Sequence, residues 1–290
     1  MSLWLDMLGA TVRSVETESF GATRIAEAGT QHAETVFFMH GIGGHLEAYA
    51  KNIVALSDRF HTVAYDFIGH GLSAKPLRDY TPTMLDQHLG ELMDTLGLQS
   101  AHLCGESLGG WVSGLFAAQH PQRVRRLILN TSAGLPILTA KGRQDLQDLV
   151  DLSRKAASQG PPNYEGILNR MKWLFHPDNH HMISDELVNT RLRFYSQPIM
   201  KDIAPRVLAM IPMHDDYLIP LDQLKAETLF LWTTDNPVHD VETARQSAAK
   251  VRGAQLYVMR APAAHWPQYE APEEFNAVVQ SFLTAGSVPA

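Results

Sequence analysis

The sequence predicts an α/β protein with a mostly parallel, eight-stranded sheet, helices on both faces of the sheet and an inserted helical cap. Two observations lead to this fold. Short apolar runs alternate with amphipathic stretches over residues 10–132 and again after residue 227. The alternation is lost between Pro136 and Asp216, where the pattern is mostly helical and contains no run rich in strand-forming residues.

The strands are predicted from the N-terminus onward. Thr11–Thr17 and Ala22–Glu27 have the pattern of an antiparallel pair. The compact apolar runs that follow are typical of strands covered on both faces, which is the environment of a parallel sheet. These runs are Val36–Met39, Thr62–Tyr65, His102–Cys104, Leu127–Leu129, Thr228–Thr233 and Gln255–Met259.

The intervening helices are predicted from amphipathic stretches, namely Met84–Leu96, Trp111–Gln119, Val241–Val251 and Pro272–Leu283. Within the insertion, Pro198, Pro205 and Pro212 should each end or bend a helix, because proline lacks the backbone N–H that a helix interior needs. We therefore expect residues 1–135 and 217–290 to form the core and residues 136–216 to form the cap.

Composition limits the kinds of partner. Hydrophobic residues make up 45% of the chain, which is enough apolar surface to bury and so argues against disorder. The net charge of −7 comes without a cluster of basic residues, which argues against binding to nucleic acid or to a membrane surface. No apolar run approaches the roughly 18 residues of a membrane span, and the N-terminus lacks the basic region of a signal peptide.

The single cysteine, Cys104, excludes an internal disulfide and suits a reducing compartment. Its position inside an apolar strand predicts a role in core packing. We expect a cytoplasmic protein that acts on a small molecule, and a homodimer is compatible with the sequence.

The segment Gly105–Gly109 has the pattern Gly-x-Ser-x-Gly, with Ser107 at its centre. It follows an apolar strand and leads into an apolar helix, which is the context of a strained strand-to-helix turn that exposes a serine hydroxyl. The two glycines keep side chains out of this tight turn. Ser107 is therefore the predicted nucleophile.

A serine hydroxyl needs a base, and the chain has 14 histidines. His265 lies in the loop after the last predicted strand, at the same carboxyl edge of the sheet as Ser107, and is the predicted base. His45 and His70 also follow strands, but they lie in glycine-rich turns and are interpreted as structural or pocket-lining.

Asp235 follows the strand Thr228–Thr233 at the same edge and is the predicted acid that orients the base. Asp240 is the alternative, although its position before Val241–Val251 favours a helix N-cap. The resulting order of serine, aspartate and histidine is the order expected of α/β-hydrolases.

Two backbone N–H groups are needed to stabilise a developing oxyanion. Leu108, directly after the nucleophile, is predicted to supply one. Ile42 is predicted to supply the other from the glycine-rich loop after Val36–Met39, in which Gly41 and Gly43 let the backbone approach a ligand.

Neither a metal nor an organic cofactor is predicted. His176, His180 and His181 in the cap have no carboxylate or cysteine at a ligand spacing.

Together, these motifs resemble the α/β-hydrolase superfamily over nearly the whole chain. A finer resemblance is to the meta-cleavage product hydrolases, which split carbon–carbon bonds in ring-opened aromatic compounds. The similar segments are Tyr65–Gly71, Gly105–Trp111, Met171–Phe175, Ser184–Val188 with Arg191, Leu231–Thr234 and His265–Gln268.

This resemblance implies that Arg191 contacts a substrate carboxylate and that Trp266 lines the pocket. The local sequence supports the role of Arg191, because its neighbours three and four residues away on the helix are apolar or aromatic and none is acidic. A buried cation needs an anion, which a substrate carboxylate would provide. The alternative is that Arg191 pairs with a distant acid or extends its guanidinium to water.

Glu106 departs from the family pattern, in which several members carry asparagine before the nucleophile as a polar partner for the substrate. A carboxylate at this position would repel a substrate carboxylate unless it pairs with a base or faces elsewhere.

The predicted function is therefore serine-dependent hydrolysis of a carbon–carbon bond in a 2-hydroxy-6-oxo-dienoate. A carboxylic-ester or lactone hydrolase is the alternative, since the triad does not identify the substrate. A ligand-binding protein that keeps the fold is disfavoured by the full set of serine, aspartate and histidine, and a cofactor-independent dioxygenase is a minor alternative.

Overall fold

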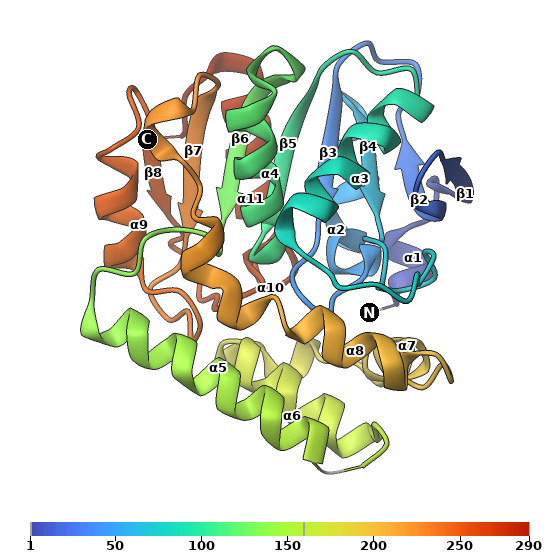
Figure 1. Ribbon diagram of the computed structural model, residues 1–290. Helices are drawn as coiled ribbons and strands as arrows, with labels where there is room; N and C mark the ends of the chain where they lie inside the picture. Colours follow the sequence, from blue (N-terminus) through green and yellow to red (C-terminus); the bar gives the residue numbers. More distant parts are fainter. Residues whose placement is uncertain (1, 159, 290) are drawn as a thin grey trace.

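The computed structural model describes residues 2–158 and 160–289, which form one eight-stranded sheet with helices on both faces (Figure 1). The strand order is β1-β2-β4-β3-β5-β6-β7-β8, and β2 runs antiparallel to both of its neighbours while the other pairs are parallel. The strands are β1 (Thr11–Thr17), β2 (Gly21–Ala28), β3 (Thr35–Met39), β4 (His61–Tyr65), β5 (Ala101–Glu106), β6 (Val124–Asn130), β7 (Glu227–Trp232) and β8 (Gln255–Val258). The predicted mostly parallel sheet is confirmed.

Both faces of the sheet are buried, which explains the continuous apolar runs. Phe37 and Phe38 are adjacent in β3 and fully buried, yet they belong to two different hydrophobic clusters, because side chains alternate across a strand. One cluster packs against α3 (Pro82–Thr95), α4 (Leu108–Gln119) and α9 (Val241–Ala248). The other, which contains Cys104, packs against α2 (Ala50–Ile53), α10 (Pro267–Glu270) and α11 (Pro272–Ala285).

Several helices begin earlier than predicted, because their first turns contain glycine or proline instead of a repeating apolar pattern. Helix α4 begins at Leu108, three residues before the predicted start, because its first turn contains glycines that carry no helical pattern. Helix α3 begins at Pro82, and the Thr81 side chain accepts a hydrogen bond from Met84 N–H as its N-cap. The helices α1 (Leu3–Asp6), α2 and α10 were not predicted, since four residues are too few to show a helical period.

Four α-helices in the described part of the chain between β6 and β7, here called the cap helices, lie across one end of the sheet (Figure 1). They are α5 (Ala140–Ser158), α6 (Tyr164–Leu174), α7 (Asp185–Tyr195) and α8 (Met200–Leu208). Helix α8 continues through Pro205, which therefore does not end it, whereas Pro198 precedes this helix and Pro212 follows it. The cap helices contact the loops that follow the strands, since Tyr195 of α7 hydrogen-bonds to Gly43 and Leu174 of α6 hydrogen-bonds to His265.

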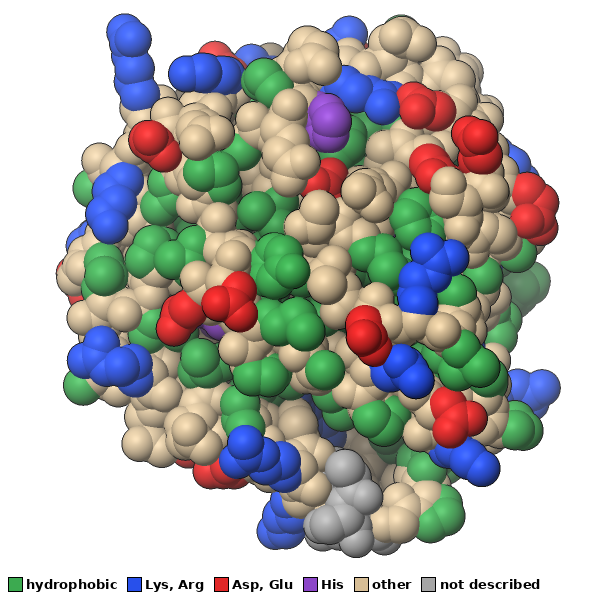
Figure 2. All heavy atoms as spheres, viewed as in Figure 1, with side chains coloured by type: hydrophobic (Ala, Val, Ile, Leu, Met, Phe, Trp, Pro, Cys, Tyr) green, Lys and Arg blue, Asp and Glu red, His purple; other side chains and the backbone are tan. Residues whose placement is uncertain are grey.

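Acidic and basic side chains are interspersed over the face on which α5 and α8 lie (Figure 2). Among the helices of residues 2–158 and 160–289, none combines the length and the apolar character that a membrane crossing requires.

Candidate active site

Ser107 stands on the turn between β5 and α4 with a backbone conformation that is unusual for a residue other than glycine, at φ 53° and ψ −113°. The turn is held by hydrogen bonds from Ser107 N–H to Asn130 O and from Trp111 N–H to Ser107 O. A side chain at Gly105 would place its Cβ 2.1 Å from the backbone of Gly109. The sequence pattern is thus explained by steric exclusion, and the strain marks a candidate functional position.

The loop after β3 lies beside this turn, because β3 and β5 are neighbouring strands. A Cβ at Gly109 would lie 2.2 Å from Met39 O, so the start of α4 approaches the end of β3 closely. Ile42 and Leu108 are brought to the same edge, and their backbone N–H groups donate to no acceptor among the described residues. Both N–H groups therefore lack an acceptor at the edge of the sheet where Ser107 lies.

His40 stabilises the first part of this loop from inside the protein. Its Nε2 accepts a hydrogen bond from Phe67 N–H, and its Nδ1 lies 2.7 Å from Gly41 O. Burial lowers the pKa of His40 to about 3, so the ring is neutral and can donate through Nδ1 while accepting through Nε2.

His265 is buried in the loop after β8, with 4% of its surface exposed. Its Nδ1 lies 3.1 Å from Asn236 Oδ1, and its Nε2 lies 2.9 Å from Glu106 Oε1. Its backbone is fixed as well, because His265 N–H donates to Leu174 O and Thr131 Oγ1 donates to His265 O. These contacts fix His265 from both the core and the cap. Among the described residues, however, no hydrogen bond joins its ring to Ser107, whose Oγ instead lies 3.5 Å from His239 Nε2.

The structure does not bring Asp235 to His265, in contrast to the sequence prediction. Asp235 is exposed and accepts a hydrogen bond from its neighbour Thr234, whereas Asn236 is buried and faces the imidazole. The amide of Asn236 is held in this orientation because its Oδ1 also accepts the backbone N–H groups of Val238 and His239. Asp240 is the N-cap of α9, as expected.

His239 is a second imidazole at the nucleophile and was not considered from the sequence. Its Nε2 lies 3.5 Å from Ser107 Oγ, and its ring centroid lies 5.5 Å from that of His265. Burial, and next the charge of His265, lower the pKa of His239 well below its usual range. His239 is thus a neutral ring with a nitrogen directed at the serine.

Glu106 is 1% exposed at the end of β5, directly before the nucleophile. Its Oε2 accepts a hydrogen bond of 2.6 Å from Gly41 N–H, while Oε1 faces His265. A Cβ at Gly41 would lie 2.7 Å from both carboxylate oxygens, so only glycine lets the loop approach this closely. Although Oε1 lies 2.9 Å from His265 Nε2, it has no hydrogen-bond partner among the described residues.

Arg191 lies inside the protein on α7, as predicted, with 4% of its surface exposed. Its guanidinium carbon is 5.4 Å from the ring centroid of Trp266, a residue that is 2% exposed. Among the described residues, Arg191 forms no ion pair with a carboxylate, and Nη1 has no hydrogen-bond partner. This is the unpaired inward cation that the helix pattern predicted.

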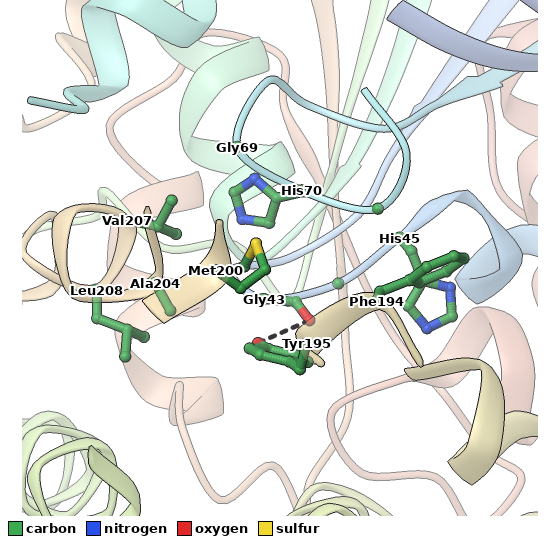
Figure 3. A pocket seen from close by; sticks show the side chains of 12 residues that line it. Gly43, His45, Gly69, His70, Phe194, Tyr195, Met200, Ala204, Val207 and Leu208 are labelled. Carbon is green, nitrogen blue, oxygen red and sulfur yellow. Dashed lines mark hydrogen bonds between the residues drawn. The ribbon is translucent and has the colours of Figure 1, made fainter. Parts of the chain in front are cut away.

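Two cavities border the site. One lies between the cap and the loops after β3 and β4; the side chains of Met200, Ala204 and Val207 face His70 across it (Figure 3). Tyr195 also lines this pocket and donates a hydrogen bond to Gly43 O. The other is lined by Ser132, Leu146 and His239 among others. Ser107 itself is 6% exposed, so the nucleophile is enclosed.

The residues that sequence reasoning missed are Asn236 and His239. Asn236 directly follows Asp235 and precedes a proline. The only signal in the sequence was therefore its position next to the predicted acid, one residue earlier in the loop. No cluster of three metal-ligating side chains was found among the described residues.

The sequence profile of the α/β hydrolase fold matches residues 34–272. A putative carbamate hydrolase, RutD, of Caulobacter sp. (strain K31) is 29% identical over 87% of this chain and 91% of its own length. A 2-hydroxy-6-oxononadienedioate/2-hydroxy-6-oxononatrienedioate hydrolase of Pseudomonas putida is 26% identical over 87% of this chain and 88% of its own.

Among solved structures, the CarC serine hydrolase involved in carbazole degradation superposes with a TM-score of 0.80 at 23% identity, covering 95% of this chain and 99% of that one. At this level of identity the likeness concerns the fold.

Proposed function

The chain belongs to the α/β-hydrolase fold family, and on that premise we propose that it is a serine-dependent hydrolase that cleaves a carbon–carbon bond in a ring-opened aromatic keto acid of the 2-hydroxy-6-oxo-dienoate type. In this proposal Ser107 is the nucleophile and His265 transfers protons. Ile42 and Leu108 stabilise the oxyanion, and residues 136–216 form a cap over the substrate.

The observation that carries the substrate class is the buried, unpaired guanidinium of Arg191. Its desolvation is costly without an anion, and a carboxylate can satisfy it with two parallel hydrogen bonds. Trp266 beside it offers an apolar face to the remainder of the substrate.

A second cation supports an anionic substrate. Burial, followed by the charge of Arg191, lowers the pKa of the nearby Arg170 to about 10. The Arg170 guanidinium lies over Trp173, 4.7 Å from the ring centroid. Two guanidinium groups that influence each other in this way favour a carboxylate between the cap and the core.

The proposed reaction has two stages, attack on the ketone carbon and cleavage of the carbon–carbon bond. Ser107, directly or through a water molecule, attacks the ketone carbon while its proton passes to an imidazole. The tetrahedral oxyanion receives the N–H groups of Ile42 and Leu108. When the carbon–carbon bond breaks, its electron pair moves to the conjugated keto-acid fragment, which takes up the proton held by the imidazole. If Ser107 itself attacked, water then attacks the acyl group on the serine; the carboxylic acid leaves, and the serine oxygen regains its proton.

The test is the decay of absorbance of a 2-hydroxy-6-oxo-dienoate, measured beside p-nitrophenyl esters. We expect turnover of the dienoate that is lost in Ser107→Ala and shows a KM raised at least about tenfold in Arg191→Ala. Arg193→Ala is the matched control, since Arg193 lies on the same helix but is exposed. Ester turnover without dienoate decay would instead identify the alternative, a carboxylic-ester or lactone hydrolase.

A further inference from the structure

The hydroxyl oxygen of Ser107 lies within hydrogen-bond distance of an imidazole that is not the predicted base. Ser107 Oγ is 3.5 Å from His239 Nε2. The ring of His265 is engaged elsewhere, since its Nδ1 lies 3.1 Å from Asn236 Oδ1. Its Nε2 lies 2.9 Å from Glu106 Oε1, and no hydrogen bond within the described part of the chain joins this ring to the serine. A base must reach the proton that it removes, so geometry favours His239.

His239 is oriented through its backbone, without an acid at its ring. Its N–H donates to Asn236 Oδ1 over 3.2 Å, and its carbonyl oxygen accepts a hydrogen bond of 2.9 Å from Trp232 Nε1. The next residue, Asp240, is the N-cap of α9 and accepts a further hydrogen bond from Thr139 Oγ1. Asn236, Trp232 and Asp240 are all buried. The ring is therefore held at the nucleophile by fixed neighbours, which is the preorganisation that a catalytic base needs.

The ring of His239 is also in the right state to accept a proton. Burial, and next the charge of His265, lower its pKa well below the usual range, so the ring is neutral and one of its nitrogens carries a lone pair. Among the described residues, Ser107 is the hydrogen-bond partner of this ring and no second group competes for Nε2. A neutral imidazole at a serine hydroxyl is the resting state from which general-base catalysis starts.

We propose that His239, in place of His265, is the general base for Ser107. The inference rests on the proposed function in taking Ser107 as the nucleophile, and it divides the proton transfers of that function between two imidazoles. The proton of the serine hydroxyl passes to His239, while the proton transfers on the substrate before the attack remain with His265.

The serine proton then follows a closed path. As Ser107 Oγ bonds to the carbonyl carbon, its O–H bond breaks, the proton moves to His239 Nε2, and the π electrons of the carbonyl become a lone pair of the oxyanion. When the intermediate collapses, the departing fragment keeps the electron pair of the broken bond and takes the proton from His239. The neutral ring can next accept a proton from the water that attacks the acyl group and pass it to Oγ. His239 lines the cavity beside Ser132 and Leu146, so water admitted there would meet this ring.

The test measures the reactivity of Ser107 without a substrate. An alkyl fluorophosphonate that carries no carboxylate bonds to a serine oxygen through phosphorus and releases fluoride, while the serine proton passes to the base. The mass of the intact protein follows the rate of labelling, and Ser107→Ala, which should stay unlabelled, identifies the site. His239→Gln and His265→Gln are compared after a check of folding by thermal unfolding.

We expect His239→Gln to be labelled at least about tenfold more slowly than the unmodified protein, and more slowly than His265→Gln. His214→Gln is the matched control, because His214 is buried and lines the same cavity but hydrogen-bonds to Leu135 O. Its labelling rate should stay within about twofold of the unmodified rate. Labelling of His239→Gln at the unmodified rate, or a larger loss in His265→Gln, would overturn the proposal.

Addition of imidazole to His239→Ala separates a base from a residue that only packs. The smaller side chain leaves space beside Ser107, and imidazole bound there supplies the missing base, so labelling should accelerate as the imidazole concentration rises. The same addition should leave the labelling rate of His265→Ala unchanged. Acceleration in His265→Ala alone would contradict the assignment.

The two proposals fail separately. Slow labelling of His239→Gln, in a protein that does not turn over the dienoate, would remove the proposed substrate and leave the base assignment supported. Dienoate turnover that depends on Ser107, with His239→Gln labelled at the unmodified rate, would do the reverse.

Discussion

Tyr195 donates its hydroxyl hydrogen to the carbonyl of Gly43 over 3.1 Å, and this bond joins cap helix α7 to the loop that carries Ile42. Gly43 has φ 65°, and a Cβ there would lie 1.9 Å from Tyr195 Oη. Two constraints therefore require glycine at position 43: the positive φ of its backbone and the close approach of the Tyr195 hydroxyl group.

Removal of this hydroxyl should loosen the loop. For Tyr195→Phe we expect the free energy of unfolding to fall by about 0.5–1.5 kcal/mol, and KM to rise more than kcat falls, because the loop lines the pocket between the cap and the core. Urea unfolding and steady-state kinetics measure both effects. Tyr164→Phe, which removes a hydroxyl bonded to Asp185 within the cap, is the control; equal kinetics in the two variants would contradict the prediction.

Asp235 and Asn236 should differ sharply despite their adjacency. Asp235→Asn changes an exposed side chain, so kcat should stay within about twofold of the unmodified protein. Asn236→Ala removes the acceptor at His265 Nδ1, so kcat should fall about 100-fold or more, as expected when an imidazole loses its orientation. A large loss in Asp235→Asn would show that the loop rearranges and that the acid is Asp235.

His239 should act as a neutral acceptor beside Ser107. For His239→Gln we expect kcat to fall at least about tenfold. The limbs of the pH profile between pH 5 and 9 should stay where they are, because burial lowers the pKa of His239 well below its usual range. Rates measured across that range test the prediction; a displaced acid limb would assign the titration to His239 itself.

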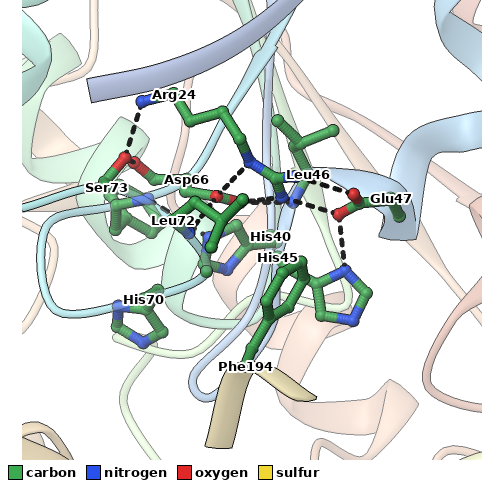
Figure 4. A network of polar contacts seen from close by, with 12 residues as sticks. Arg24, His40, His45, Leu46, Glu47, Asp66, His70, Leu72, Ser73 and Phe194 are labelled. Carbon is green, nitrogen blue, oxygen red and sulfur yellow. Dashed lines mark hydrogen bonds and ion pairs between the residues drawn. The ribbon is translucent and has the colours of Figure 1, made fainter. Parts of the chain in front are cut away.

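The polar network around Arg24 should make stability depend on pH. Arg24 bonds to Asp66 and Glu47, and His45 bonds to Glu47 (Figure 4). Although burial acts in the opposite direction, the bonds with His45 and Arg24 lower the pKa of Glu47 from 4.5 to about 2.

Because the pKa of Glu47 is lower in the folded protein than in the unfolded chain, its carboxylate stabilises the fold at pH values above the unfolded pKa. This contribution is lost as the pH falls from 4.5 towards 2. Urea unfolding between pH 2.5 and 6 should show this loss. Glu47→Gln should be less stable at pH 6 and should lack this part of the pH dependence; parallel curves for the two proteins would refute the assignment.

The sheet could be predicted because its strands are buried on both faces and therefore stand out as apolar runs, as Phe37 and Phe38 show. The nucleophile turn was equally accessible, since the steric limits at Gly105 and Gly109 act within a few residues. The short helix α2 and the passage of α8 through Pro205 depend on packing with distant elements, which local patterns do not record.

The orienting residue could not be predicted from the sequence for a related reason. Neighbouring side chains in a loop point in different directions, so a shift of one residue exchanges the buried position for the exposed one. The loop around Asn236 is set by tertiary contacts such as the bond from Trp232 Nε1 to His239 O. The same contacts bring His239 to Ser107, although nothing in the local sequence distinguishes this histidine from the other thirteen.

The bond from His265 N–H to Leu174 O has a kinetic consequence. The backbone of the proton-transfer residue is held by the last residue of cap helix α6, so a movement of this helix away from the core breaks that bond. Ser107 is 6% exposed, so a substrate needs an opening to reach it. Under the proposed function, an opening made by moving α6 would release His265 at the same time, so that admission of the substrate and proton transfer would exclude each other.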